Sequence, residues 1–193
     1  MSPIGAKSSV SESKKNLRLL ARATRRNLVR REAGARLRDI FLSSEIPLAP
    51  DLIVGGYWPM GGEMDSRPLL TALDDIGIRC ALPVVVAPDM PLIFRQWRAG
   101  DELENNNHGV KAPLASAPEL VPDLLLVPLL AFDAKGYRLG QGGGYYDRTL
   151  AASGALAVGL AYAGQEIDKV PHESHDARFD WIVTEAWARK IEL

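Results

Sequence analysis

Hydrophobic residues recur at helical spacing through the first quarter of the chain. Over residues 11–43 the apolar positions fall every three to four residues, with Arg and Lys between them, at Leu17, Leu20 or Ala21, Thr24 and Leu28. Proline is absent from this stretch and returns only at Pro47. The pattern therefore predicts a long amphipathic helix over 11–43, in which Gly34 is a candidate point of interruption.

Shorter apolar runs, bounded by Gly and Pro, follow. They are typical of buried strands, which we predict at 52–58, 79–86, 92–97, 124–128, 155–162 and 181–184. The 79–86 and 92–97 runs flank a turn-forming Ala-Pro-Asp stretch and are expected to form a hairpin. Helical spacing predicts two further helices, at 66–76 and at 144–153. The polar, proline-rich stretch 100–122 has no periodic pattern and is predicted to be a long surface loop.

The order of these elements indicates the fold class. The 124–128 strand, a glycine-rich turn, the 144–153 helix and the 155–162 strand form a βαβ unit, which favours a mainly parallel sheet between helices. We predict an α/β fold: a three-layer α/β/α sandwich with a mostly parallel or mixed central sheet, Rossmann-like, with a long N-terminal helix. We expect residues 1–193 to form one domain and residues 1–10 to form a flexible tail.

Composition and charge exclude several classes of protein. Hydrophobic residues make up 47% and charged residues 24% of the 193 positions, and no apolar run approaches the roughly 20 residues of a membrane helix. The N-terminus lacks the apolar core of a secretory signal, so we expect a cytoplasmic protein that contacts no membrane. Cys80 is the single cysteine and there are three histidines, which excludes a disulfide and argues against structural zinc. The net charge is −1, yet residues 14–38 are strongly basic, which indicates either an anionic ligand or a solvated helix.

A glycine-rich segment carries the chemistry. Four glycines lie within five positions at Gly140 and 142–144, ahead of the predicted helix. Such a loop presents backbone N–H groups next to the positive end of a helix, which suits a phosphate. Arg138 is placed to clamp phosphate oxygens, and Asp147 to hold magnesium directly or through water. From glycine content alone, a flexible surface turn is an equally good interpretation, and no standard phosphate or dinucleotide motif is present.

The motif around this loop is long enough to carry a resemblance. Residues 138–148 read Arg-Leu-Gly-x-Gly-x-Gly-Tyr-Tyr-Asp-Arg, after Pro-x-x-Ala-Phe-Asp-x-x-Gly at 128–136. This run resembles the signature of the 5-formyltetrahydrofolate cyclo-ligase family. Further family-like segments occur in the same order at 14–18, 57–66, 82–84, 109–113 and 171–180. The resemblance therefore extends over most of the chain.

The resemblance implies an activity. In the family's reaction, ATP phosphorylates the formyl oxygen of 5-formyltetrahydrofolate, N10 attacks the activated carbon, and phosphate leaves as 5,10-methenyltetrahydrofolate forms. It implies ATP as co-substrate, Mg²⁺ as cofactor, and 5-formyltetrahydrofolate, with or without a polyglutamate tail, as partner. We expect a monomer that binds no nucleic acid.

Two alternatives remain open from the sequence. One is a repurposed relative that binds nucleotide or folate without turnover, because a fold alone does not determine function. The other is a nucleic-acid contact by the basic first helix; the near-neutral net charge and the lack of a nucleic-acid motif count against it.

The resemblance also implies roles for residues at the phosphate end. Arg138 and Asp147 match catalytic positions, and Asp147 and Asp176 match magnesium ligands. ATP contacts match Lys14, Arg18, Arg138, Leu139, Gly140, Gln141, Gly142, Gly143, Gly144, Tyr145 and Tyr146. Without the resemblance, Lys14 and Arg18 would be interpreted as a solvated basic helix face, and the two acids as surface residues.

A second set matches folate contacts. It contains Trp58, Glu63, Gln141, Gly142, Gly143, Gly144 and Tyr145. A carboxylate accepts hydrogen bonds from the pterin N–H and amino groups, and an aromatic ring covers its face. On local sequence alone, Glu63 would be an ordinary loop carboxylate and Trp58 a core residue.

A few positions fit less well. Trp97 is a weak pterin-pocket candidate that we interpret as a buried strand residue. We give the general-base interpretation of His172 and His175 little weight, and expect His175 to orient Asp176 or to cap a turn. The family often reads Gly-Ile-x-Glu-Pro where residues 109–113 read Gly-Val-Lys-Ala-Pro, which puts a carboxylate role there in doubt.

Overall fold

A central sheet of eight strands organises the protein in the computed structural model, which describes residues 4–105, 109–173 and 176–192. The strand order is β12-β11-β10-β7-β1-β2-β3-β6. The bounds are β1 Ile53–Gly55, β2 Arg79–Val84, β3 Ile93–Trp97, β6 Glu119–Leu120, β7 Leu124–Pro128, β10 Leu156–Leu160, β11 Trp181–Val183 and β12 Ala188–Lys190. The five strands from β11 to β2 run parallel, and β12, β3 and β6 join antiparallel at the two edges. The mixed, mostly parallel α/β fold is confirmed.

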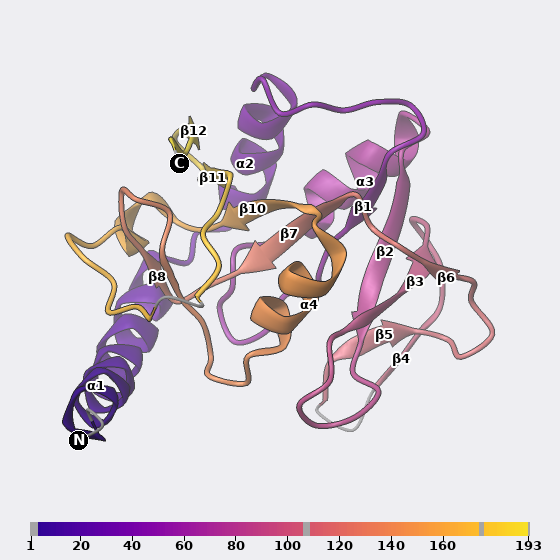
Figure 1. Cartoon of the computed structure of the whole chain (residues 1–193). Helices are drawn as coiled ribbons and strands as arrows, with labels where there is room; N and C mark the ends of the chain where they lie inside the picture. Colours follow the sequence, from indigo (N-terminus) through magenta and orange to yellow (C-terminus); the bar gives the residue numbers. More distant parts are fainter. Residues whose placement is uncertain (1–3, 106–108, 174–175, 193) are drawn as a thin grey trace.

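Helices cover both faces of this sheet (Figure 1). Leucines and Phe41 of α2 (Ala33–Leu42) and α3 (Arg67–Asp75) pack on one face, against Val54, Leu126 and Val158. On the other face Leu150 of α4 (Tyr145–Ser153) packs with Leu125, Val127 and Ile182. Neighbouring residues of β7 and β10 thus point to opposite layers, as a strand buried on both faces requires.

The longest helix, α1 (Ile4–Leu28), lies beside the sheet rather than on it (Figure 1). It begins at Ile4, and residues 1–3 lie outside the described part; the flexible tail expected over residues 1–10 stays a prediction. It ends at Leu28, so the predicted single helix over 11–43 is in fact two helices. Arg30 caps this end of α1, because its guanidinium donates to the carbonyls of Asn27 and Val29 at 2.9 Å each.

Residues 29–32 separate α1 from α2, so the predicted helix is interrupted near Gly34, as expected, although Gly34 itself does not break a helix. It lies buried within α2, where an added Cβ would approach the Asp65 carbonyl oxygen to 2.7 Å. Its role is close packing of α2 against the segment that leads into α3.

The stretch 100–122 is more ordered than predicted. It contains the antiparallel pair β4 (Leu103–Asn105) and β5 (Lys111–Pro113), and then β6 at the sheet edge. Residues 106–108, between β4 and β5, lie outside the described residues. The prediction of a structureless loop was wrong here because two- and three-residue strands are too short to show an alternating pattern.

Parallel strands end at one edge of the sheet, and the segments after them approach one another there. Residues 57–63 follow β1, Val85 follows β2, and Leu129 follows β7. In the sheet, β1 lies between β7 and β2. From β1 the chain continues to β2 on one side, and from β7 it continues to β10 on the other side, so the strand order reverses between β7 and β1, the position where open α/β sheets bind ligands. The small pair β8 (Ala131–Phe132) and β9 (Arg138–Leu139) then carries the chain into the glycine-rich loop at this edge.

Candidate active site

A cavity of about 700 Å³ opens at the carboxyl edge of the sheet. This volume suits a ligand the size of a cofactor or drug. Its lining includes every site residue predicted from the sequence: Lys14, Arg18, Trp58, Glu63, Arg138, Leu139, Gly140, Gln141, Gly142, Gly143, Gly144, Tyr145, Tyr146, Asp147 and Asp176. The structure thus brings together segments that are up to 162 positions apart in sequence.

The glycine-rich loop runs from β9 to the first turn of α4. Gly142 and Gly144 have positive φ of 106° and 66°, a region that favours glycine. A Cβ on Gly142 would lie 3.4 Å from the Arg18 guanidinium carbon, and one on Gly144 would lie 2.6 Å from Arg148 Nη1. The loop therefore needs glycine both for its conformation and for the close approach of two arginines.

One face of α1 forms a cationic wall. Lys14, Arg18, Arg22 and Arg25 follow one another at spacings of four, four and three residues, so they project from the same side of the helix. Arg18 Nε donates to the Gly140 carbonyl at 3.0 Å. Arg22 donates from Nε and Nη2 to Gln141 Oε1 at 3.2 and 3.0 Å. The helix thereby holds the loop from one side.

Two ion pairs stand at the phosphate end of the cavity. Lys14 Nζ lies 2.6 Å from Asp176 Oδ2, and Arg138 Nη2 donates to Asp147 Oδ1. Arg138 also donates to the Ala177 carbonyl at 2.6 Å. Burial lowers the pKa of Arg138, while the charges of Asp147 and Asp176 act in the opposite direction. Both carboxylates thus lie close enough to Arg138 to influence its charge, although they come from different segments.

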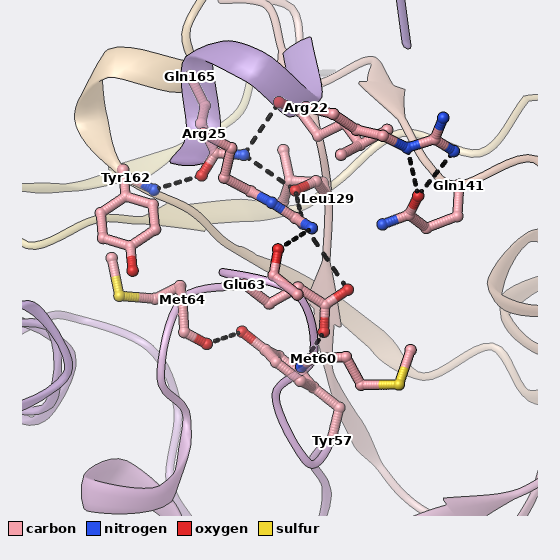
Figure 2. A network of polar contacts seen from close by, with 12 residues as sticks. Arg22, Arg25, Tyr57, Met60, Glu63, Met64, Leu129, Gln141, Tyr162 and Gln165 are labelled. Atoms are coloured by element: carbon pink, nitrogen blue, oxygen red, sulfur yellow. Dashed lines mark hydrogen bonds and ion pairs between the residues drawn. The ribbon is translucent and has the colours of Figure 1, made fainter. Parts of the chain in front are cut away.

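The opposite end of the cavity is built on a tight turn after β1. The Glu63 N–H donates to the Met60 carbonyl at 2.9 Å, and the Met60 N–H donates to Glu63 Oε2 at 3.0 Å. The Glu63 side chain is only 7% exposed. Burial raises the pKa of Glu63, against the lowering influence of the Met60 N–H, Arg25 and Gln141. A buried carboxylate is therefore held at the wall of the cavity, within a network that includes Arg25 (Figure 2).

Aromatic residues complete this end. Tyr57 donates its hydroxyl to the Met64 carbonyl at 2.6 Å, and burial raises the pKa of both Tyr57 and Tyr146, which keeps them neutral. Trp58 lines the cavity and packs edge-on against Trp97, with ring centroids 6.3 Å apart. Trp97 itself is 4% exposed and belongs to the core, as expected for a strand residue.

His172 stands apart from this geometry. The ring of His172 stacks on Tyr137 at 3.5 Å, its Nδ1 lies 2.9 Å from the Val170 carbonyl oxygen, and it does not line the cavity. His175 lies outside the described residues, so its predicted orienting role stays a prediction.

A resident metal centre is not evident in the part of the chain that the structure describes, where no three His, Cys, Asp or Glu side chains gather to hold an ion. Two carboxylates beside a phosphate loop fit a different arrangement. Magnesium is commonly bound through one or two carboxylates together with the phosphates of a nucleotide. Asp147 and Asp176 fit a magnesium ion that arrives with its nucleotide.

Sequence reasoning missed several residues of the cavity and its wall. Tyr57, Met60 and Leu92 line the cavity, and Arg22 and Arg25 support it from α1. A signal for the two arginines was present, because they continue the helical spacing from Lys14 and Arg18. No such signal marks Leu92, which lies in the turn before β3. Its N–H donates to the side-chain hydroxyl of Thr149 on α4, and this contact places Leu92 at the site.

Val110 also lines the cavity, and Ala112 is buried at 2% exposure in β5. These residues lie in the segment where the family often has an acidic residue. Residues 109–113 therefore contribute apolar surface and no carboxylate to the structure at this point.

Comparisons with known proteins agree on one family. A family model described as the 5-formyltetrahydrofolate cyclo-ligase family matches residues 10–185. The 5-formyltetrahydrofolate cyclo-ligase of Mycolicibacterium smegmatis is 35% identical over 144 residues, which cover 68% of this chain and 72% of the relative. The Escherichia coli K12 protein of the same name is 36% identical over 139 residues, covering 68% and 76%.

A solved structure agrees with these sequence matches. The NMR structure of Aquifex aeolicus 5,10-methenyltetrahydrofolate synthetase superposes with a TM-score of 0.78 at 29% identity and covers 93% of both chains. No helix among the described residues is long and apolar enough to cross a membrane.

Proposed function

The chain belongs to the 5-formyltetrahydrofolate cyclo-ligase family, and from this premise we propose that its cavity converts 5-formyltetrahydrofolate and ATP to 5,10-methenyltetrahydrofolate, ADP and phosphate. The observation that carries the proposal is the shared cavity: a phosphate-type loop with its cations and a buried carboxylate flanked by aromatics line the same space. A phosphoryl donor and a pterin must meet within bonding distance for this reaction, and one cavity provides that proximity.

ATP takes the end formed by the glycine-rich loop. The backbone N–H groups of Gly140 to Gly144 and of the N-terminus of α4 donate hydrogen bonds to phosphate oxygens. Lys14, Arg18 and Arg138 surround the same loop and neutralise the charge on the phosphates as it shifts during transfer. Lys14 pairs with Asp176 and Arg138 with Asp147 in the structure, so nucleotide binding exchanges these partners for phosphate oxygens.

Magnesium enters this site with the nucleotide. Asp147, in the first turn of α4, and Asp176, beside Lys14, are the carboxylates that would hold it. When bound, the ion neutralises charge on the phosphates. The exchange of ion-pair partners described above releases both carboxylates for this purpose.

5-Formyltetrahydrofolate takes the end formed by the turn at Glu63. Glu63 accepts hydrogen bonds from the pterin N–H and amino groups, and Trp58 and Tyr145 provide flat apolar surface for its rings. The buried, neutral Tyr57 and Tyr146 keep water away from the carboxylate. This arrangement orients the formyl oxygen toward the loop.

The chemistry needs positioning more than an activated side chain. The formyl oxygen attacks the γ-phosphorus of ATP, and ADP leaves. N10 then attacks the formyl carbon and gives up its proton, and the C–O bond breaks to release phosphate. The role of this chain is to hold the two substrates in line and to screen the charge that moves between them.

A direct test mixes the purified protein with 5-formyltetrahydrofolate, ATP and Mg²⁺ and follows the absorbance of the methenyl product. Omission of each component in turn is the control. We expect product only when all three are present, with one ADP formed per product. Folded protein that binds ATP and yet forms no product would instead favour a repurposed relative that binds without turnover.

A further inference from the structure

A buried arginine stands behind the carboxylate at the pterin end. Arg25 is 3% exposed although it comes from α1, most of whose residues face solvent. Its Nη1 donates to the Leu129 carbonyl at 3.2 Å and its Nη2 to the Gly61 carbonyl at 3.1 Å. Figure 2 shows the guanidinium reaching from the helix between Leu129 and Glu63. Arg25 does not line the cavity, whereas Glu63 does.

The contact between Arg25 and Glu63 is close without being a hydrogen bond. Nη1 lies 3.7 Å from Glu63 Oε1, while the side chains are 4% and 7% exposed. Glu63 Oε2 accepts from the Met60 N–H. The Arg25 charge therefore acts on the carboxylate at short range in a poorly hydrated place, and it leaves Oε1 with acceptor capacity.

Stability does not account for this arginine. Its Nε is buried and has no hydrogen-bond partner among the described residues. A buried ion pair with an unsatisfied donor and a separation too long for a hydrogen bond is a poor stabilising device, and replacement of such a whole pair by well-packed apolar side chains is often neutral for stability. The charge of Arg25 is therefore more easily explained by what it does to Glu63.

We propose that Arg25 is a positioning residue for the folate substrate: it holds the Met60 to Glu63 turn in place and keeps the Glu63 carboxylate ionised where it meets the pterin. The proposal rests on the proposed function, in which Glu63 is the folate contact. Two neighbouring donors, an N–H and an amino group, need the two acceptor oxygens of an ionised carboxylate; a protonated carboxyl group would present its own O–H to one of them.

Among the groups that face Glu63, Arg25 carries the positive charge that favours the ionised carboxylate. Burial raises the pKa of Glu63, and the Met60 N–H, the Arg25 charge and Gln141 oppose that shift. The other titratable groups that face it are Tyr57, after β1, and Tyr146, on α4; both have raised pKa values and stay neutral. Gln141 is uncharged, and its Oε1 accepts a hydrogen bond from Arg22. Loss of Arg25 therefore raises the pKa of Glu63 further.

The test is the pH profile of kcat/KM for 5-formyltetrahydrofolate in R25Q. We expect the acid limb to move to higher pH by about one unit, which is about a tenfold loss at a pH on that limb, with activity returning as the pH rises. The KM for ATP is expected to stay within about twofold of wild type. R26Q is the matched control, because it removes an exposed arginine from the same helix turn and should leave the profile unchanged.

A double substitution separates positioning from folding. In an E63Q background the limb due to Glu63 is absent, so R25Q should add little further loss. An R25Q profile that coincides with wild type, or losses from R25Q and E63Q that simply multiply, would overturn the proposal while the wild-type methenyl assay still supports the proposed function. Absence of methenyl product from wild type would instead overturn the function.

A second measurement does not depend on the folding of any Arg25 variant. The ¹³C carboxyl resonance of Glu63 in the wild-type protein, assigned by its loss in E63Q, reports the ionisation state directly. We expect a carboxylate at pH 7. A protonated Glu63 at that pH would overturn the proposal.

Discussion

The two ends of the cavity hold their charged groups in opposite ways. At the phosphate end the acids and bases pair with each other across the opening, and the Asp147 side chain is 42% exposed. At the pterin end the carboxylate of Glu63 is 7% exposed, and its cation stands behind it, out of the cavity. The first arrangement must change its partners when a ligand binds, and the second is ready beforehand.

This difference predicts which kinetic constant each kind of substitution should change. In the proposed reaction, groups that exchange partners serve the charge that develops during phosphoryl transfer, so their loss should appear mainly in kcat. Groups that are fixed beforehand serve binding of the pterin, so their loss should appear mainly in KM for the folate. Four substitutions test this division.

The largest effect is expected for Asp147→Asn. The amide keeps the size of the side chain but removes the charge that pairs with Arg138 and that is offered to magnesium. We expect kcat for methenyl formation to fall about 10²- to 10³-fold, as for other lost charge-stabilising groups. Folate affinity, followed by tryptophan fluorescence, should change little. A wild-type kcat would remove Asp147 from the site.

Glu63→Gln should act at the other end. It replaces an ionised acceptor by a neutral amide, which costs the charged part of its hydrogen bonds to the pterin, and kcat/KM for the folate should fall about 10- to 100-fold. The dissociation constant of ATP, measured by calorimetry, should stay within about twofold of wild type. The exposed Glu45→Gln provides a control for the loss of one carboxylate. A large change in ATP affinity would contradict the division between the two ends.

Gly142→Ala tests the loop backbone. The positive φ of 106° and the nearby Arg18 oppose a methyl group, so we expect a rise of several-fold in KM for ATP and a loss of about 1–3 kcal/mol in stability. Gly154→Ala is the control, since Gly154 also has positive φ but nothing lies within 4 Å of its added Cβ. That variant should lose stability alone. Equal KM values for ATP in the two variants would mean that the loop does not contact the nucleotide.

Lys14→Met should have the smallest effect. The substitution keeps the apolar stem and removes an ion pair to Asp176 that is part-exposed. We expect a stability change under about 1 kcal/mol in thermal unfolding and about a fivefold rise in KM for ATP. The rise should shrink at high salt, because screening weakens the lost attraction. An effect on KM for the folate larger than that for ATP would contradict the placement of Lys14 at the phosphate end.

Much of the fold could be predicted because its strongest signals are local. The runs at 124–128 and 156–160 are apolar throughout, as strands buried on both faces must be, and β7 and β10 lie there. A break near Gly34 could be predicted, but its position after Leu28 could not, since neither Gly nor Pro occurs at residues 29–32, where the Arg30 side chain caps the helix. β8, β9 and β12 are two or three residues long and depend on partners distant in sequence.

The candidate site likewise has a part that the sequence predicts and a part that it does not. The motif at 138–148 identified the loop, because glycine at these positions answers a backbone requirement that is visible in the sequence. Arg25 could not be singled out, because its importance comes from burial against Leu129 and Gly61, which only the folded chain reveals. From the sequence it looked like one more cation on a basic helix.

The position of α1 has a thermodynamic consequence. From Lys14 to Arg25 the helix spans eleven residues, roughly 16 Å, and bonds to the nucleotide loop at one end and to the turn of Glu63 at the other. The single helix α1 therefore contacts both ends of the site. In the proposed complex, ATP draws Lys14 and Arg18 away from their present partners, and Arg25 lies on the same helix as these two residues. Any linkage that this helix creates between the binding free energies of the two substrates must be reciprocal, so that each alters the affinity for the other by the same factor.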